Sequence, residues 1–199
     1  RRAGGPHPRA GGALGNHTGD PVEPTADIRL AIPDDAAKLA EFAERVFRRT
    51  FGPDNTASDL EQYVGSAFGE ALQRRELEDT ERVCLLAHVG GTLSAFALLR
   101  VGATDAAVIG PSPVEIERFY VAYDFHGHGL AAHLMAACIE TAVARGGRTL
   151  WLGVWEKKAR AIRVYEKRGF ADVGSHPFVL GTDVQTDRVM QRAIGPASA

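Results

Sequence analysis

The stretch DFHGHGLAAHLM, residues 124 to 135, gathers side chains and glycines that could do chemistry. Its three histidines could bind a metal ion, or its small residues could form a loop that binds phosphate. The metal site is the weaker interpretation, because two ligands on one helix face are normally four residues apart and His128 and His133 are five apart. No Cys, Asp or Glu at a recognised spacing completes a ligand set, so we expect no metal.

The glycines of this stretch favour an anion site. His126-x-x-Gly129-x-Ala131 follows a predicted strand and precedes a predicted helix. Small residues let the backbone approach a ligand closely, and the first helical turn offers unpaired N–H groups at the positive end of the helix dipole. Such a site most often binds phosphate or pyrophosphate. It is not a Walker loop, because no Gly-Lys-Ser/Thr follows, and its spacing does not fit the dinucleotide fingerprint.

Hydrophobic periodicity predicts the elements that position this loop. Three helices come first, followed by a hairpin through Gly90-Gly91, and Thr56 with Asp59 predicts a capping box at the second helix. The predicted strands cover 27–31, VCLLAHV, TLSAFALLRV, 114–122, 149–155, FADVGSHPFVL and TDRVMQRAI, and the later helices run from about 130 to 145 and from 158 to 168. This order predicts an α+β fold.

Bulk properties narrow the class of protein. The chain has 199 residues, 45% hydrophobic residues and a net charge of -2, which argues against a nucleic-acid-binding module. No apolar run approaches the roughly 20 residues of a membrane span. We expect a flexible tail over 1–25, a single domain over 26–195, and core thiols at Cys84 and Cys138 in a cytoplasmic protein.

Two segments resemble the GNAT superfamily of N-acetyltransferases. One is the loop just described, whose preceding strand reaches Val121 five residues before His126. The other is LGVWEKKARAIRVYEKRGF, residues 152–170. FRRTFGPDNTASDLEQYV and FVLGTDVQTDRVM also look like the PaiA-type spermidine/spermine N-acetyltransferases. The resemblance implies a mixed, mostly antiparallel twisted sheet of six to seven strands flanked by about four helices.

The resemblance also implies acetyl-CoA as cosubstrate and a set of residues that bind it. Backbone at Phe119 and Val121 would pair with pantetheine as an added strand does. Lys158 stands where the family usually has Asn, and its ammonium, Arg160 or Arg163 could reach a CoA phosphate; the alternative for Lys158 is a surface cation. Main-chain N–H groups would hold the pyrophosphate at His126, Gly127, His128, Gly129, Leu130 and Ala131.

The implied reaction is attack of an amine on a thioester. An alkylamine has a pKa near 10.4, so a base must remove its proton, and an acid must protonate the departing thiolate. Glu115 and Glu117 are the candidate bases; the alternative is a strand face whose carboxylates pair with neighbouring cations. Tyr165 matches the family's acid, against the alternative of a core aromatic residue at helical spacing from Ile162.

Charge is the feature of the sequence that suggests where the acceptor amine binds. Asp54, Asp59 and Glu61 could bind a polyamine cation, or they could be solvated carboxylates at a helix start. The resemblance implies acetyl transfer to a small primary amine such as a polyamine. The alternatives are transfer to a protein or peptide amine, and a CoA-binding sensor that does not catalyse. We expect His176 to be structural, and edge pairing of the last strands could form a homodimer.

Overall fold

The computed structural model describes residues 26–195, so the tail expected over 1–25 lies outside the described residues. One seven-stranded sheet has the strand order β1-β2-β3-β4-β5-β7-β6. The strands are β1 (Asp27–Leu30), β2 (Arg82–Val89), β3 (Thr92–Val101), β4 (Pro113–Val121), β5 (Thr149–Trp155), β6 (Ala171–Leu180) and β7 (Asp183–Ala193). The predicted α+β class and the number of strands are confirmed.

The described residues hold five α-helices and three short 3-10 helices, where the periodicity predicted five helices and the family resemblance implied about four. None of these helices is long and apolar enough to cross a membrane. The helices are η1 (Pro33–Asp35), α1 (Ala36–Phe51), η2 (Gly52–Asp54), α2 (Ala57–Ala67), α3 (Glu70–Glu78), η3 (Tyr123–Phe125), α4 (Leu130–Ala144) and α5 (Ala159–Lys167).

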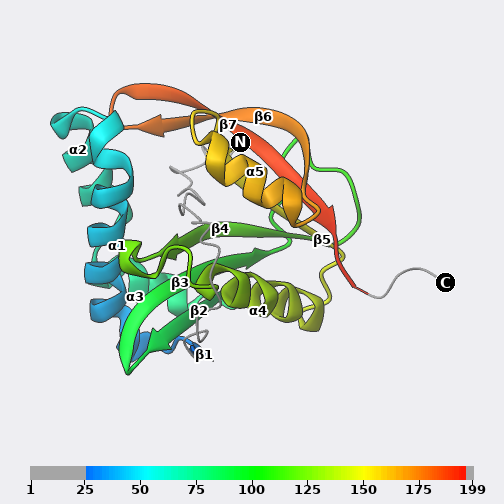
Figure 1. Cartoon of the computed structure of the whole chain (residues 1–199), viewed down its shortest axis with the longest axis horizontal. Helices are drawn as coiled ribbons and strands as arrows, with labels where there is room; N and C mark the ends of the chain where they lie inside the picture. The colour runs from blue at the N-terminus through cyan, green and yellow to red at the C-terminus, as the bar shows by residue number, and fades with distance from the viewer. Residues whose placement is uncertain (1–25, 196–199) are drawn as a thin grey trace.

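Buried apolar side chains form one layer on each face of the sheet. Leu134 of α4 and Tyr165 of α5 belong to one layer, and Phe47 of α1 and Tyr63 of α2 belong to the other. Each fully buried side chain of this size contributes about 1.5–3 kcal/mol. Figure 1 shows α4 beside β2–β4 and α5 beside the β5–β7–β6 half, with α1 and α2 standing at the end of the molecule.

The sheet opens between its two central strands. β4 and β5 are parallel and pair only from Pro113–Thr149 to Glu115–Trp151, although β4 continues to Val121. Beyond that point the two strands separate, and Figure 1 shows the two halves of the sheet diverging from the start of β5 toward α1. The second half of β4 therefore has an edge that no strand within residues 26–195 covers.

A β-bulge in β4 falls at Glu117, one of the two candidate bases. Leu98 pairs with Arg118 and Leu99 pairs with Ile116, which leaves Glu117 as the extra residue. Glu117 bonds to Arg82, whose cross-strand neighbour Arg100 is also the neighbour of Glu115. Both carboxylates therefore lie on the same face of the sheet, as alternation along the strand predicts.

The predicted cap at the start of α2 is present. The Asp59 N–H donates to Thr56 Oγ1 at 3.2 Å. We expect Thr56→Ala to lower the free energy of unfolding by about 1 kcal/mol, because the helix loses its N-cap. Ser58→Ala is the matched control on the same helix, since Ser58 is exposed. Equal denaturant midpoints for the two variants would contradict a capping role.

Candidate active site

The β4–α4 loop has the backbone that a tight anion site requires. Gly127 and Gly129 have φ angles of 88° and 78°, in the left-handed region that glycine adopts without strain. Gly129 is the N-cap of α4, so the chain turns directly from this conformation into the helix. The glycines identified from the sequence therefore set the direction of the first turn of α4.

Four amides at this turn have no hydrogen-bond partner within residues 26–195: those of Gly127, Gly129, Leu130 and Ala131. The other two predicted amides already bond inside the loop, since His126 N–H donates to Tyr123 O at 3.0 Å and His128 N–H to Phe125 O at 3.4 Å. Convergent free N–H groups at a helix N-terminus form an anion site. The structure thus narrows the predicted set of six amides to four.

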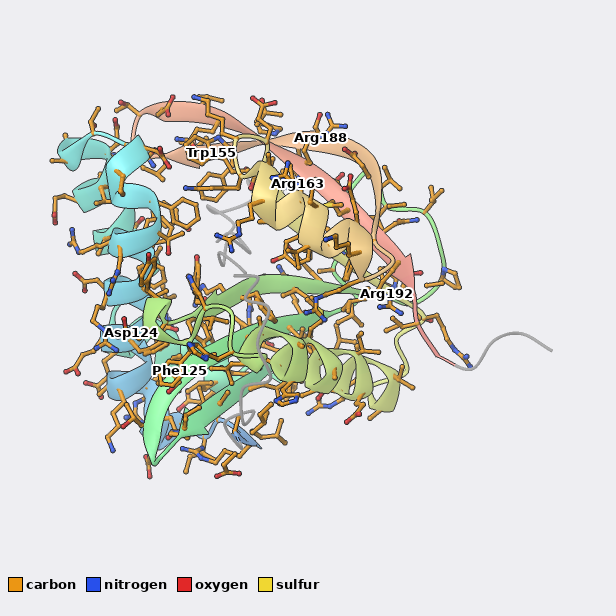
Figure 2. The ribbon with its side chains drawn as sticks, in the orientation of Figure 1. Asp124, Phe125, Trp155, Arg163, Arg188 and Arg192 are labelled. Atoms are coloured by element: carbon orange, nitrogen blue, oxygen red, sulfur yellow. The ribbon has the colours of Figure 1, made fainter. Side chains whose placement is uncertain are left out.

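A cavity of about 510 Å³, here called the loop cavity, separates this turn from α5. Arg160, Arg163, Lys167 and Arg168 line it, and no carboxylate does; the remaining lining residues are Val121, Phe125, His126, Gly127, Gly129, Ala131, Ala132 and Val164. In Figure 2, Arg163 lies on α5, whereas Asp124 and Phe125 lie with the β4 half. The cavity is therefore cationic on one wall and rich in amides on the other.

Sequence reasoning missed two of these cations, Lys167 and Arg168. The spacing of Arg160, Arg163 and Lys167, three and then four residues, is that of one helix face and could have shown the pattern. Burial lowers the pKa of Arg168, whose Nε has no hydrogen-bond partner among the described residues. A half-desolvated guanidinium of this kind favours an anion in the cavity.

His126 separates the loop cavity from a second one. Its Nε2 lies 3.0 Å from Val121 O, and burial lowers its pKa, which favours the neutral ring. His128 is exposed. Among the described residues, no group of three or more His, Cys, Asp or Glu side chains could hold a metal ion.

The free edge of β4 presents main-chain groups to the opening in the sheet. Ala122 N–H donates to Ser94 O of β3. Because alternate residues of an antiparallel strand direct their N–H and C=O groups to opposite edges, Phe119 and Val121 direct theirs away from β3. These are the two residues predicted to pair with pantetheine.

Glu115 and Glu117 differ sharply in their surroundings. Glu117 is buried and accepts two hydrogen bonds from Arg82, at 2.8 and 3.1 Å. Glu115 is also buried, and burial, reinforced by the negative charge of Glu117, raises its pKa to about 8. Of the two predicted bases, Glu115 has the environment that holds a proton near neutral pH.

Tyr165 is fully buried between α5 and the sheet. Its ring packs against Phe170 with centroids 5.7 Å apart, and its hydroxyl has no hydrogen-bond partner among the described residues. Burial raises the pKa of this hydroxyl, so it keeps its proton. The ring contributes to the core, and the hydroxyl remains available as a donor.

The two residues predicted for phosphate binding on the 158–160 segment have different neighbours. Lys158 Nζ lies 2.7 Å from Asp54 Oδ2 and 3.2 Å from Thr50 O, so its charge is directed at the α1–α2 connection rather than the loop cavity. Arg160 lines both cavities. No sequence pattern could show the Lys158–Asp54 pair, because 104 residues separate its members.

The second cavity, here called the α1 cavity, has a volume of about 380 Å³ and lies between α1, η3 and the start of α5. It shares Val121, Phe125, His126 and Arg160 with the loop cavity; its other lining residues are Arg45, Val46, Arg49, Thr50, Thr92, Leu93, Ala122, Tyr123, Asp124, Lys158 and Ala161. The two cavities therefore meet at His126.

Two carboxylates predicted for the acceptor side have local partners. Asp59 Oδ1 accepts from the Thr182 N–H at 2.6 Å, and hydrogen bonds from Thr56 and then Thr182 lower the pKa of Asp59. Glu61 pairs with Arg48 at 2.5 Å. Neither lines the α1 cavity or the loop cavity.

Comparison with known proteins is consistent with this geometry. A model of the acetyltransferase (GNAT) family matches residues 41–170. An uncharacterised N-acetyltransferase of Mycobacterium tuberculosis is 32% identical over 160 residues, which cover 80% of this chain and 98% of that protein.

Solved structures share the fold at lower identity. The PaiA N-acetyltransferase of Thermoplasma acidophilum, in complex with coenzyme A, is 17% identical to this chain and superimposes with a TM-score of 0.69. The match covers 85% of this chain and 99% of that protein chain. The yncA protein of Salmonella typhimurium, solved with its cofactor acetyl-CoA, is 19% identical with a TM-score of 0.66 and covers 87% of this chain and 96% of its own.

Proposed function

The chain belongs to the acetyltransferase (GNAT) family, and we propose that it transfers the acetyl group of acetyl-CoA to a small primary amine. One observation carries the proposal: three residues with unpartnered amides, Gly127, Gly129 and Ala131, line the loop cavity together with four cations. CoA carries a pyrophosphate and a 3′-phosphate, which match these two kinds of donor. Backbone N–H groups and a helix N-terminus suit the pyrophosphate, and the α5 cations suit the second phosphate.

The open edge of β4 supports the placement of the rest of the cofactor. Phe119 and Val121 offer N–H and C=O groups to an extended pantetheine, as an edge strand does to an added strand. His126 must then release Val121 O, or share it, when pantetheine enters. This arrangement directs the thioester toward the point where β4 and β5 separate.

The reaction then needs only groups of the chain itself. A neutral amine attacks the thioester carbon, a C–N bond forms, and the C–S bond breaks with its electron pair leaving on sulfur. Glu115, ionised, takes a proton from the amine, and Tyr165 donates one to the sulfur. Positioning of the two reactants supplies much of the remaining rate enhancement.

The acceptor that we propose to test first is a polyamine such as spermidine. Asp54 borders the α1 cavity through its pair with Lys158, and Asp59 and Glu61 lie on α2 near the same end of the molecule. A cationic acceptor would compete with Lys158 for Asp54. The fold shared with the PaiA N-acetyltransferase is consistent with this choice.

A thiol-release assay tests the function. The full chain is mixed with acetyl-CoA and a panel of polyamines, simple alkylamines and peptides with a free α-amine or lysine, and free CoA is followed with a thiol reagent. Catalytic release with one class of amine is expected. Release no faster than in enzyme-free controls, for every amine and peptide, would leave a CoA-binding sensor as the better description.

Removal of α5 cations should weaken CoA binding. We expect Arg163→Gln to raise the Kd of CoA about tenfold, which corresponds to about 1.4 kcal/mol, because one charge-assisted contact to phosphate is lost. Calorimetry at two salt concentrations should also show a weaker salt dependence. Arg75→Gln on α3 is the matched control, since Arg75 lines neither cavity; an equal effect of both variants would contradict the assignment.

A further inference from the structure

A histidine and a carboxylate meet on the face of the sheet that carries Glu115. His176 Nδ1 of β6 lies 3.1 Å from Asp105 Oδ2, in the loop between β3 and β4. The rings of His176 and Trp151 have centroids 6.5 Å apart, and Trp151 is the cross-strand neighbour of Glu115. The pair is therefore close to the last rung that joins β4 to β5.

The loop that carries Asp105 is fixed to the sheet. Asp105 Oδ1 accepts from the Ala107 N–H at 2.9 Å, so both carboxylate oxygens have partners. Trp151 Nε1 donates to Ala103 O at 2.8 Å, and Ile109 N–H donates to Gln191 Oε1 at 2.8 Å. In the Nδ1–H tautomer the imidazole donates to this carboxylate and keeps the lone pair on Nε2.

The other ring nitrogen of His176 lies over Gly153 of β5. Nε2 lies 3.0 Å from the position that a Cβ atom on Gly153 would occupy, and Asp187 Oδ2 lies 3.5 Å from the same position. Gly153 is two residues beyond Trp151, where the β4–β5 ladder ends. Nε2 therefore lies over a part of β5 that has no pairing with β4 among the described residues.

The proton balance of the reaction leaves one proton that must reach the solvent. An ammonium ion and a thioester give an amide, a thiol and one free proton, so the nitrogen loses two protons during the reaction. One leaves before the nitrogen attacks, and the other leaves once the C–N bond has formed. One of them restores the proton that Tyr165 gives to sulfur, and the other must reach the solvent from Glu115, whose carboxylate is buried.

We propose that His176, oriented by Asp105, is the second proton acceptor of the reaction and returns protons to solvent. The inference rests on the proposed acetyl transfer. The groups that face the imidazole are Asp105 from the loop, Asp187 from β7 and Trp151 from β5, and Glu115 lies beside Trp151. The side chain of His176 is 19% exposed, which allows it to release a proton to water.

Kinetics of two matched variants test this role. His176→Gln should lower kcat on the order of 10²-fold, the lower end of what a positioned base contributes, with little change in the KM of acetyl-CoA or amine. His88→Gln, on β2 with four strands between it and β6 in the sheet, should leave kcat unchanged. Added imidazole should restore part of the turnover of His176→Ala but not that of a Glu115→Gln variant.

The outcomes separate the inference from the function on which it rests. An active wild type together with an unchanged His176→Gln variant would overturn only the role of the histidine. A wild type that turns over no amine would overturn both. ¹⁵N NMR of His176 in the wild type is a second test that does not depend on whether a variant folds. The Nδ1–H tautomer is expected at pH 8, and an Nε2–H tautomer would overturn the inference.

Discussion

Glu115→Gln is expected to lower kcat by about 10²–10³-fold at pH 8, because the variant has no carboxylate to take the proton of the bound ammonium. This expectation rests on the surroundings of Glu115 in the wild type. Glu115 is buried, and both burial and the charge of Glu117 disfavour its ionised form, which raises its pKa to about 8. At pH 7 roughly one molecule in ten is ionised, so the enzyme is expected to speed up with rising pH.

The protonation state in which Glu115 acts determines whether kcat rises or falls with pH. The ionised carboxylate is the base, so wild-type kcat should rise through pH 8 and then level off. In Glu115→Gln that limb should vanish, and turnover should rise only as the free amine appears, toward its pKa of about 10.4. A variant profile with the wild-type limb near 8 would assign that limb to another group. Glu81→Gln, an exposed carboxylate on the turn before β2, is the control.

Tyr165→Phe is expected to lower kcat by about 10²-fold while leaving the Kd of CoA nearly unchanged. The hydroxyl is the donor for the departing sulfur, and Phe keeps the ring in its contact with Phe170. Loss of the acid should matter less for a thioester analogue whose thiol has a lower pKa, because such a thiolate departs without a proton. A comparison of the two donors therefore separates acid catalysis from packing.

Stability gives the control for the same variant. The Tyr165 hydroxyl is buried without a partner among the described residues, so its removal relieves a desolvation penalty. We expect an unfolding midpoint equal to or above that of the wild type. A large loss of stability, or an equal loss of rate with both thioester donors, would return Tyr165 to a purely structural role.

Much of the fold could be predicted from periodicity and from turn residues. Gly90 and Gly91 join β2 and β3, Thr56 caps α2, and the seven strands lie where alternation and apolar runs predicted them. These signals are local, because a hydrogen bond or a positive φ angle involves neighbours in the chain. The opening between β4 and β5 is not local: the ladder ends at Glu115–Trp151, and 36 residues separate these two along the chain.

The candidate site could be predicted where it consists of backbone. The glycines of the β4–α4 loop and the first residues of α4 lie together because they are consecutive. Long side chains were harder to place, because their partners come from distant segments: Lys158 reaches Asp54, and Asp59 holds Thr182. The His176–Asp105 pair was hidden for the same reason, since 71 residues separate its members.

Detection of acetylated amine is the most direct test of the proposed acetyl transfer. The full chain, in catalytic amount, is incubated at pH 8 with acetyl-CoA labelled with ¹³C in the acetyl group and with the amine panel, and products are identified by mass spectrometry. We expect labelled acetylamine in many-fold excess over enzyme from the wild type, and about 10²-fold less from Glu115→Gln and Tyr165→Phe. Bound CoA with no labelled amine or peptide above the enzyme-free level would contradict acetyl transfer by this site.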